Sequence, residues 1–311
     1  VKQILDGEMD IHRGYMARLG ISLADAEKAQ TALDNRSYTA YMLQVGYEEG
    51  AAQIAVSILS CALSYEHIAR RMLEKYPEMM IVANAKTLPM LTGYYGITAD
   101  KVLVMKEGES LSLGSCSLSF HMIPMVHWPE TMVTWLEEEG TLFSGDAFGT
   151  FGSIDEEVID EEGTFEQFRD EMTRYYACIV GKYGIPVQTA LKKLGGLQIK
   201  RVCSTHGPVW EKNIPAVVAL YDKMSRYEVE RGVCIVYGSM YGNTAAAAEA
   251  LAEELRRLGV PCAIHDLAGN VNPGLGVSGA LRDVFKYDTI VAASPTYNNG
   301  IFPPVETFMK A

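Results

Sequence analysis

The feature that most constrains the fold is a polar, glycine-containing loop, residues 237–244, between a short apolar stretch and an alanine-rich stretch. Residues 233–236 predict a β-strand, and the alanine-rich residues up to about Leu258 predict an α-helix. A tight loop from a strand into a helix leaves backbone N–H groups without partners, and the positive end of the helix dipole lies beside them. The sequence therefore predicts an anion-binding loop.

The side chains of this loop favour the phosphate of FMN over that of ATP or GTP. Hydroxyl and amide groups can bind a phosphate without adding positive charge, and no lysine follows Gly242 as it would in a nucleoside-triphosphate loop. An ordinary strand-to-helix turn is the alternative for this loop taken alone. The residues predicted to contact the cofactor here are Ser239, Met240, Tyr241, Gly242, Asn243 and Thr244.

A second polar loop supports the FMN interpretation. Residues 287–293 predict a buried strand, and the loop follows at its carboxyl end. In open α/β sheets, ligands bind beyond the carboxyl ends of the strands, so both loops can contact one ligand. Tyr297 offers an aromatic face to a flavin ring. The residues predicted to contact the cofactor in this loop are Pro295, Thr296, Tyr297, Asn298, Asn299 and Gly300.

Composition narrows the possible partners and location. A chain of 311 residues is long enough for two domains. Its net charge of −12 argues against nucleic acid and anionic membrane surfaces and suits a basic electron-transfer partner. No apolar run approaches the roughly 20 residues of a membrane span, and the N-terminus lacks a signal-peptide pattern. Six scattered cysteines without a CxxC pair favour a reducing cytoplasm.

Periodicity divides the chain near residue 230. Before that point strands come first, helices follow and strands return, which predicts an αββα sandwich for residues 1–230. Residues 231–311 form the second predicted domain, and residues 230–232 are the predicted hinge. The predicted elements of the first domain are a β-meander over 101–123, a strand pair over 131–144, helices over 165–182 and 187–194, a strand over 199–203, and a helix over 214–228.

Three side chains in the first domain have the chemistry of metal ligands. His127, Asp146 and His206 each lie where a predicted strand gives way to a loop with glycine or proline nearby. Imidazole and carboxylate groups on such loops are ligands of iron and zinc. Taken singly, each has a plainer interpretation, as a capping aspartate or a structural histidine beside a turn. Together they predict a metal site.

The segments around these three residues resemble the flavodiiron proteins. The motifs are HWPETM from His127, LFSGDAFG around Asp146 and HGPVW from His206, separated by 19 and 60 residues. Flavodiiron proteins join a metallo-β-lactamase-like domain to a flavodoxin-like domain, a doubly wound parallel sheet. The resemblance covers about residues 70–311. It implies FMN and a diiron centre in which Asp146 bridges the irons, with His127 and His206 each on one of them.

One expected motif is absent. The resemblance calls for a His-x-Glu-x-Asp-His element about sixty residues before His127, and the chain has no such element. Either the chain belongs to a branch without the diiron centre, or its N-terminal third differs from the native polypeptide. Alignment through residues 74–77 places the missing ligands at Ser60, Ala62, Ser64 and Tyr65, with Glu66 and His67 as possible substitutes.

The second departure is at the C-terminus. A flavodoxin-like unit continues through two more strands and a third flavin loop beyond the elements found in residues 231–311. We therefore expect a longer natural chain, with the C-terminal part of this domain absent here. The last predicted strand would then be an open sheet edge, and FMN would bind more weakly.

The resemblance implies an oxidoreductase that passes electrons from FMN to a diiron site, which reduces O2 to water or NO to N2O. Rubredoxin or a flavin/NADH reductase would be the electron donor. A head-to-tail homodimer, or a dimer of dimers, would bring the FMN of one chain to the metal of another. Two alternatives remain open: a flavin electron-transfer protein with a degenerate metal site, and a zinc hydrolase on the metallo-β-lactamase fold.

Overall fold

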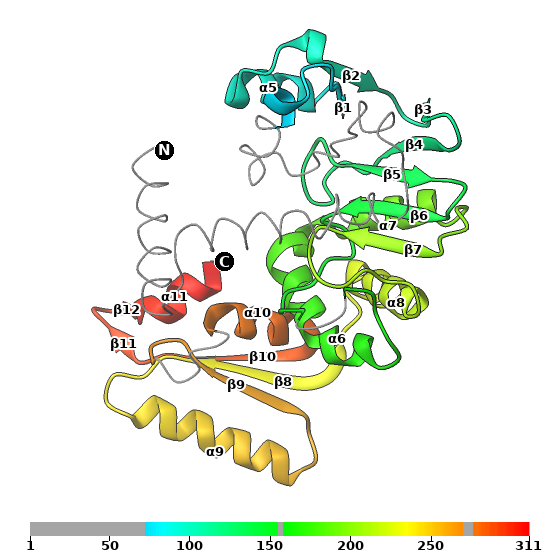
Figure 1. The fold of residues 1–311 in the computed structure, drawn as a ribbon. Helices are drawn as coiled ribbons and strands as arrows, with labels where there is room; N and C mark the ends of the chain where they lie inside the picture. The colour runs from blue at the N-terminus through cyan, green and yellow to red at the C-terminus, as the bar shows by residue number, and fades with distance from the viewer. Residues whose placement is uncertain (1–71, 155–157, 270–275, 311) are drawn as a thin grey trace, which may run out of the picture. The chain divides into compact units, whose positions relative to one another are not determined.

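The computed structural model describes residues 72–154, 158–269 and 276–310, all of which belong to one compact unit (Figure 1). The first half of this part contains a five-stranded sheet, a two-stranded sheet and four helices longer than two turns. The elements are β1 (Ile81–Asn84), α5 (Thr87–Tyr95), β2 (Val102–Met105), β3 (Ser110–Ser112), β4 (Ser117–Met122), β5 (Met132–Leu136), β6 (Thr141–Gly145), α6 (Thr164–Tyr175), α7 (Gly184–Leu194), β7 (Arg201–Ser204) and α8 (Ile214–Ser225).

The five-stranded sheet has the order β3-β4-β5-β6-β7. Its first three junctions are antiparallel, whereas β6 and β7 run parallel with Gly145 opposite Ser204. Helices α6, α7 and α8 lie beside this sheet (Figure 1), because their apolar residues complete its core. The buried cluster includes Val133, Leu142 and Val202 from the strands and Met172, Val187 and Val217 from the helices.

The predicted β-meander over residues 101–123 is wrong in its first member. Strand β2 pairs with β1, with Ile81 opposite Val102, and these two strands form a separate parallel sheet. Parallel neighbours need a crossover connection, and α5 supplies it between β1 and β2. The apolar pattern of β2 indicated a strand but not its partner. Only β3 and β4 form the predicted hairpin.

The second half is a parallel sheet of order β10-β8-β9. One face of β8 packs Val233 and Ile235 against α9, and the other packs Cys234 and Val236 against α10 and α11. Helices on both faces confirm the predicted doubly wound sheet. The elements are β8 (Glu230–Tyr237), α9 (Asn243–Arg257), β9 (Cys262–Asp266), α10 (Gly276–Lys286), β10 (Tyr287–Ala293), β11 (Thr296–Tyr297), β12 (Gly300–Ile301) and α11 (Pro303–Lys310).

One local prediction for this half is wrong. Residues 230–232, the predicted hinge, form the start of β8, where Glu230 pairs with Tyr287. Gly232 is required by close packing, because a Cβ there would lie 2.3 Å from the Tyr287 ring. Strand β10 was predicted to be buried, yet Ile290 is 49% exposed. The reason is that β10 is the outer strand of the described sheet, with a neighbouring strand on one side only.

Within residues 72–154, 158–269 and 276–310, every helix is too short or too polar to span a bilayer.

Candidate metal and flavin sites

The structure brings the three predicted metal ligands to one edge of the five-stranded sheet. His127 lies in the loop between β4 and β5, Asp146 directly follows β6, and His206 follows β7. Because β6 and β7 are parallel, their carboxyl ends lie together, and the Thr205 N–H donates to the Gly145 carbonyl at 2.8 Å. The fold therefore gathers side chains from three separate loops.

Asp146 is the centre of this group. Its carboxylate is buried, with Nε2 of His127 3.1 Å from Oδ2 and Nε2 of His206 3.5 Å from Oδ1. The His127 side chain is 22% exposed and that of His206 is 53% exposed. One imidazole thus faces each carboxylate oxygen, which is the arrangement expected of a carboxylate that bridges two metal ions.

Two further residues hold this group, and the sequence analysis missed both. The Thr205 hydroxyl donates to Asp146 Oδ1 at 2.6 Å. The Tyr175 hydroxyl donates to the Asp146 carbonyl at 3.2 Å, and its ring centroid lies 5.6 Å from that of His206. Thr205 directly precedes the predicted ligand His206, and this position is a signal for a residue that orients a metal ligand by a hydrogen bond. Tyr175 comes from the end of α6, and nothing in its local sequence points to this contact.

Buried aromatic side chains fix the loop that carries Asp146. The Trp210 Nε1–H donates to the Phe148 carbonyl at 3.1 Å, and the Tyr221 hydroxyl donates to the Gly149 carbonyl at 3.3 Å. Burial raises the pKa of Tyr221 well above its usual value, so its hydroxyl stays protonated and remains a donor. The backbone of residues 146–149 is therefore anchored to the core of the domain.

The described residues fit the bridging part of a diiron centre. Two imidazoles and a carboxylate suit iron or zinc. However, among the described residues no three or more His, Cys, Asp or Glu side chains gather so as to hold one metal ion. Each side of Asp146 has one imidazole and one carboxylate oxygen, so further ligands of each ion have to come from elsewhere. The positions predicted for them, Ser60, Ala62, Ser64 and Tyr65 with Glu66 and His67 nearby, lie outside the described residues.

The two predicted flavin loops also lie together. They follow β8 and β10, which are adjacent parallel strands with Tyr237 opposite Ala293. The Gly238 N–H donates to the Ala293 carbonyl at 3.1 Å. A Cβ on Gly238 would lie 2.9 Å from Phe302 and from Val305, so the segment after the second loop packs directly on the first. One ligand at this edge can therefore contact both loops, as predicted.

The first loop has the backbone that a phosphate site needs. Gly242 precedes α9 with a φ of +87°, which favours glycine, and its N–H donates to the Ser239 hydroxyl at 3.1 Å. The first turn of α9 contains no acidic residue, so nothing in that turn opposes an anion. Tyr241 is 88% exposed beside this helix start. These features fit the phosphate end of FMN.

The second loop is a small hairpin of β11 and β12. Asn298 and Asn299 form its turn with φ values of +48° and +60°, a conformation that asparagine tolerates better than most residues. Both asparagines are predicted to contact the cofactor, and their backbone conformation also shapes the turn. Tyr297 is 48% exposed, with its ring centroid 5.8 Å from that of Phe302, and its accessible ring fits a flavin face.

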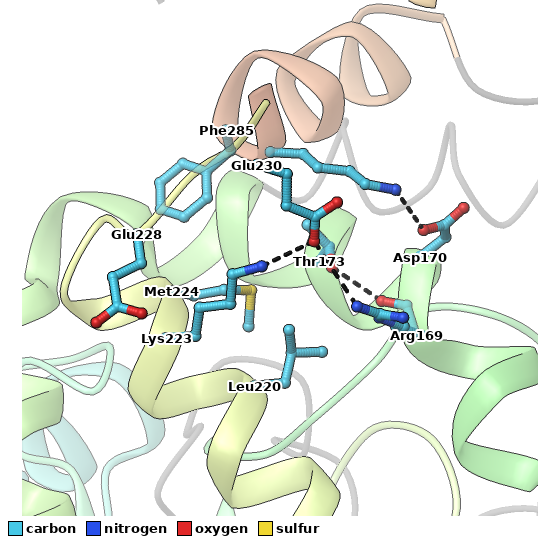
Figure 2. A pocket seen from close by; sticks show the side chains of 10 residues that line it. Arg169, Asp170, Thr173, Leu220, Lys223, Met224, Glu228, Glu230 and Phe285 are labelled. Atoms are coloured by element: carbon cyan, nitrogen blue, oxygen red, sulfur yellow. Dashed lines mark hydrogen bonds and ion pairs between the residues drawn. The ribbon is translucent and has the colours of Figure 1, made fainter. Parts of the chain in front are cut away.

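A small pocket lined by α6, α8, the start of β8 and α10 is a weaker candidate for a ligand site (Figure 2). Most of its charged groups already pair with one another. Glu230 lies 2.7 Å from Lys223 Nζ and 3.7 Å from Arg169, and Asp170 lies 3.6 Å from Lys286 Nζ. The hydrogen bond from Lys223 is the largest of the effects that lower the pKa of Glu230. We therefore interpret this cluster as structural.

Comparisons with known proteins agree with the two predicted domain types. A family described as "ODP family beta lactamase" matches residues 68–207, and the "Flavodoxin" family matches residues 235–310. A third family, "TENA/THI-4/PQQC family", matches residues 1–89. The chain thus carries the two domain signatures in the predicted order, preceded by a segment similar to a different family.

Individual relatives show the same combination. Rubredoxin oxygen:oxidoreductase from Desulfovibrio gigas superposes with a TM-score of 0.72 at 25% identity, over 78% of this chain and 60% of that one. The anaerobic nitric oxide reductase flavorubredoxin of Aeromonas hydrophila is 28% identical over 77% of this chain and 48% of its own. Over its described residues, this chain shares its sequence pattern and its fold with the flavodiiron proteins. This likeness confirms the predicted fold class, a metallo-β-lactamase-like sandwich followed by a flavodoxin-like sheet.

The chain is also 30% identical to an uncharacterized protein of Methanocaldococcus jannaschii, over 74% of this chain and 56% of the relative. It therefore spans about half the length of the curated relatives that it matches. The roles of His127, Asp146 and His206 as ligands, and of the two loops as the FMN site, stay predictions.

Proposed function

We propose that this chain carries out flavodiiron-type electron transfer, from FMN to a non-haem diiron site that reduces O2 to water or NO to N2O. The observation that carries the proposal is the buried carboxylate of Asp146 with an imidazole at each oxygen. The relatives named as a nitric oxide reductase flavorubredoxin and a rubredoxin oxygen:oxidoreductase support both candidate substrates.

FMN would supply one-electron transfer between a protein donor and the metal centre. The loop of residues 239–242 and the first backbone N–H groups of α9 would bind its phosphate, because the start of a helix favours an anion. The exposed ring of Tyr297 would lie beside the flavin, and the hairpin turn at Asn298 and Asn299 would hold that tyrosine in place.

Iron would supply redox chemistry at an open coordination position. Asp146 would bridge the two ions, while His127 and His206 would each bind one. Tyr175 and Thr205 hold Asp146 by its carbonyl and by its carboxylate, so the bridging group keeps one orientation. The remaining ligands would come from the segment before residue 72, where Glu66 and His67 are the nearest candidates in sequence.

We further propose the partners and organisation of the chain. The net charge of −12 favours a basic donor surface, on rubredoxin or a flavin/NADH reductase. A head-to-tail homodimer, or a dimer of such dimers, would place the FMN of one protomer near the metal of its partner. Residues 1–230 would form the metal-binding part and residues 231–311 the FMN-binding part. The six scattered cysteines without a CxxC pair favour a cytoplasmic location.

The first prediction tests this function through Asp146. In the Asp146→Ala variant we expect a loss of at least about a hundredfold in NO or O2 reduction, because both ions lose their shared ligand. Flavin absorbance should stay at the wild-type level, since Asp146 lies outside the FMN loops. Reduction rates, iron content and the visible spectrum are measured on the same samples. Unchanged turnover by the iron-loaded variant would contradict the assignment.

The absent His-x-Glu-x-Asp-His element favours a second candidate, a flavin electron carrier whose metal site is degenerate. That protein would bind FMN but no metal. A zinc hydrolase on the same fold would instead contain zinc without FMN, and the two flavin loops argue against it. Metal analysis combined with a visible spectrum of the wild-type chain distinguishes the three functions.

A further inference from the structure

The hairpin of β11 and β12 carries a reactive pair of residues that FMN binding does not explain. Asn299 is followed by Gly300, and no other asparagine in the 311-residue sequence precedes a glycine. In such a pair the backbone nitrogen of the glycine can attack the side-chain amide carbon of the asparagine, because glycine has no Cβ to hinder the approach. This reaction therefore meets the least steric hindrance in the chain at Asn299.

The hairpin presents the pair to water. Asn298, Asn299 and Gly300 are all exposed, and the hairpin lies beyond the carboxyl end of β10 (Figure 1). A Cβ built on Gly300 would lie 3.6 Å from the Tyr297 carbonyl, an ordinary contact distance, with no closer neighbour outside the adjoining residues. Packing therefore leaves room around the glycine nitrogen.

The hairpin is held closed by a very short ladder. It has two residue pairs, Thr296 with Ile301 and Tyr297 with Gly300. In the closed state the pairing with Tyr297 engages the Gly300 backbone. A ladder of this length opens at little cost in free energy, and opening frees the Gly300 nitrogen for reaction.

The base of the loop is held separately from its tip. The Phe302 N–H donates to the Ser294 hydroxyl at 2.9 Å, and this bond closes the loop below the hairpin. The tip is a two-residue turn with positive φ at both positions, +48° at Asn298 and +60° at Asn299. Such a turn fixes the register of the two strands, so a change in its backbone length disrupts their pairing.

We propose that Asn299 is a site of spontaneous deamidation, and that the modified hairpin loses its contact with FMN. The Gly300 nitrogen bonds to Asn299 Cγ, the Cγ–Nδ2 bond breaks, and the amide nitrogen leaves as ammonia with the Gly300 amide proton. Water then opens the succinimide ring, at Cγ to give aspartate or at the main-chain carbonyl to give isoaspartate. Isoaspartate runs the backbone through its Cβ, so the turn gains one atom and the pairing of Tyr297 with Gly300 is lost.

Bound FMN should protect the site. This part of the inference, together with the loss of FMN binding, rests on the proposed function, whereas the reaction at Asn299 does not. FMN in contact with residues 295–300 binds the closed hairpin and thereby lowers the population of the open one. With free FMN at about a hundred times its dissociation constant, the reaction should slow by about a hundredfold.

The second prediction follows this reaction in the 311-residue chain, incubated at mildly alkaline pH with and without FMN. Peptide mapping by mass spectrometry measures the conversion of amide to acid at each asparagine and separates aspartate from isoaspartate. Without FMN we expect Asn299 to convert while Asn298, which is also exposed but precedes Asn299, keeps its amide. The fraction of chains that binds FMN, from absorbance titration, should fall in step with the isoaspartate fraction.

Gly300→Ala is the matched control. Gly300 does not have a positive φ, and the space around it accepts a Cβ, so alanine fits the closed hairpin. The added methyl group hinders the backbone nitrogen, and conversion of Asn299 should fall to the level of Asn298. Circular dichroism confirms that the variant is folded, and the comparison of the two asparagines within the wild type does not depend on it.

Several results would overturn the inference. Asn299 that keeps its amide as long as Asn298 would do so, and so would equal conversion in the wild type and in folded Gly300→Ala. Equal conversion with and without bound FMN, or full FMN binding by isoaspartate-containing chains, would overturn the link between the hairpin and FMN. A wild-type chain that binds no FMN would overturn the proposed function, while the FMN-free comparison of Asn299 with Asn298 would still decide the modification site.

Discussion

Two buried aspartates, one in each half of the described chain, show how the same group can serve different purposes. Asp146 and Asp283 are each 4% exposed, and a histidine lies beside each carboxylate. Nε2 of His127 is 3.1 Å from Asp146, and Nε2 of His265 is 2.8 Å from Asp283. Asp146 directly follows β6, an inner strand of its sheet. Asp283 lies within helix α10, which packs on one face of the flavodoxin-like sheet.

The other neighbours of the two carboxylates explain the difference. Arg282 donates to both oxygens of Asp283, at 2.8 Å and 2.9 Å. A guanidinium is cationic at every ordinary pH, so the charge of Asp283 is balanced inside the protein. The pair therefore stabilises the fold. Asp146 instead faces two imidazoles and a hydroxyl. A neutral imidazole can bind a metal ion, so the charge of Asp146 can contribute to a metal site.

The third prediction addresses the structural aspartate and has the largest expected effect on stability. Asp283→Asn should lower the free energy of unfolding by about 3 kcal/mol, because Arg282 loses its buried ionised partner and keeps only the longer, exposed pair with Asp170. Urea unfolding near pH 7 measures this change. Glu306→Gln, which breaks the exposed pair with Lys310, is the control and should change stability by at most about 0.5 kcal/mol. Equal effects of the two variants would remove the distinction between Asp283 and a surface carboxylate.

The pH dependence of the same variant sharpens the comparison. Burial opposes the charge of Asp283, but the hydrogen bonds from His265 and Arg282 outweigh it and hold the pKa below its usual value. The stabilisation is therefore fully present above the unfolded pKa of about 3.9 and is lost as the pH falls through the lower folded pKa. The stability difference between wild type and Asp283→Asn should stay constant from about pH 7 to about pH 5 and shrink below about pH 4. A difference that grows on acidification would contradict this sign.

The fourth prediction concerns a glycine of the metal side. Gly207 follows His206 with a φ of +84°, and a Cβ there would lie 2.2 Å from Thr150 Cγ2. Gly207→Ala should cost about 2 kcal/mol in unfolding free energy, from backbone strain together with this collision. It should also displace His206 and weaken metal binding. Chemical denaturation and metal titration measure the two effects, and a fully stable variant with wild-type metal affinity would contradict both.

The fifth prediction is the matched glycine of the flavin side, and its effect on stability is the smallest. Gly242 has a similar φ of +87°, but a Cβ there would meet nothing within 4 Å. Gly242→Ala should therefore cost only about 1 kcal/mol, from backbone strain alone. Its functional effect should appear in FMN affinity, because the loop backbone changes beside the start of α9. Fluorescence titration with FMN measures this. A loss of stability as large as that of Gly207→Ala would mean that the two loops are equally packed.

Much of the fold could be predicted from local pattern. The strands over residues 132–136 and 141–145, the helix from residue 164 and the parallel strand over residues 230–237 lie close to where periodicity placed them. The partner of β2 and the exposure of β10 could not be predicted, because apolar patterning reports which residues can be buried and not which segment covers them.

The sequence by itself determined which chemical groups are available and in what order. The spacing of His127, Asp146 and His206, and the glycine-containing loops after two apolar strands, follow directly from it. Tertiary structure decided which oxygen of Asp146 faces which histidine, and it brought Thr205 and Tyr175 to that residue. These contacts depend on the parallel register of β6 with β7 and on the packing of α6. Such long-range contacts form between segments that carry no local signal for one another.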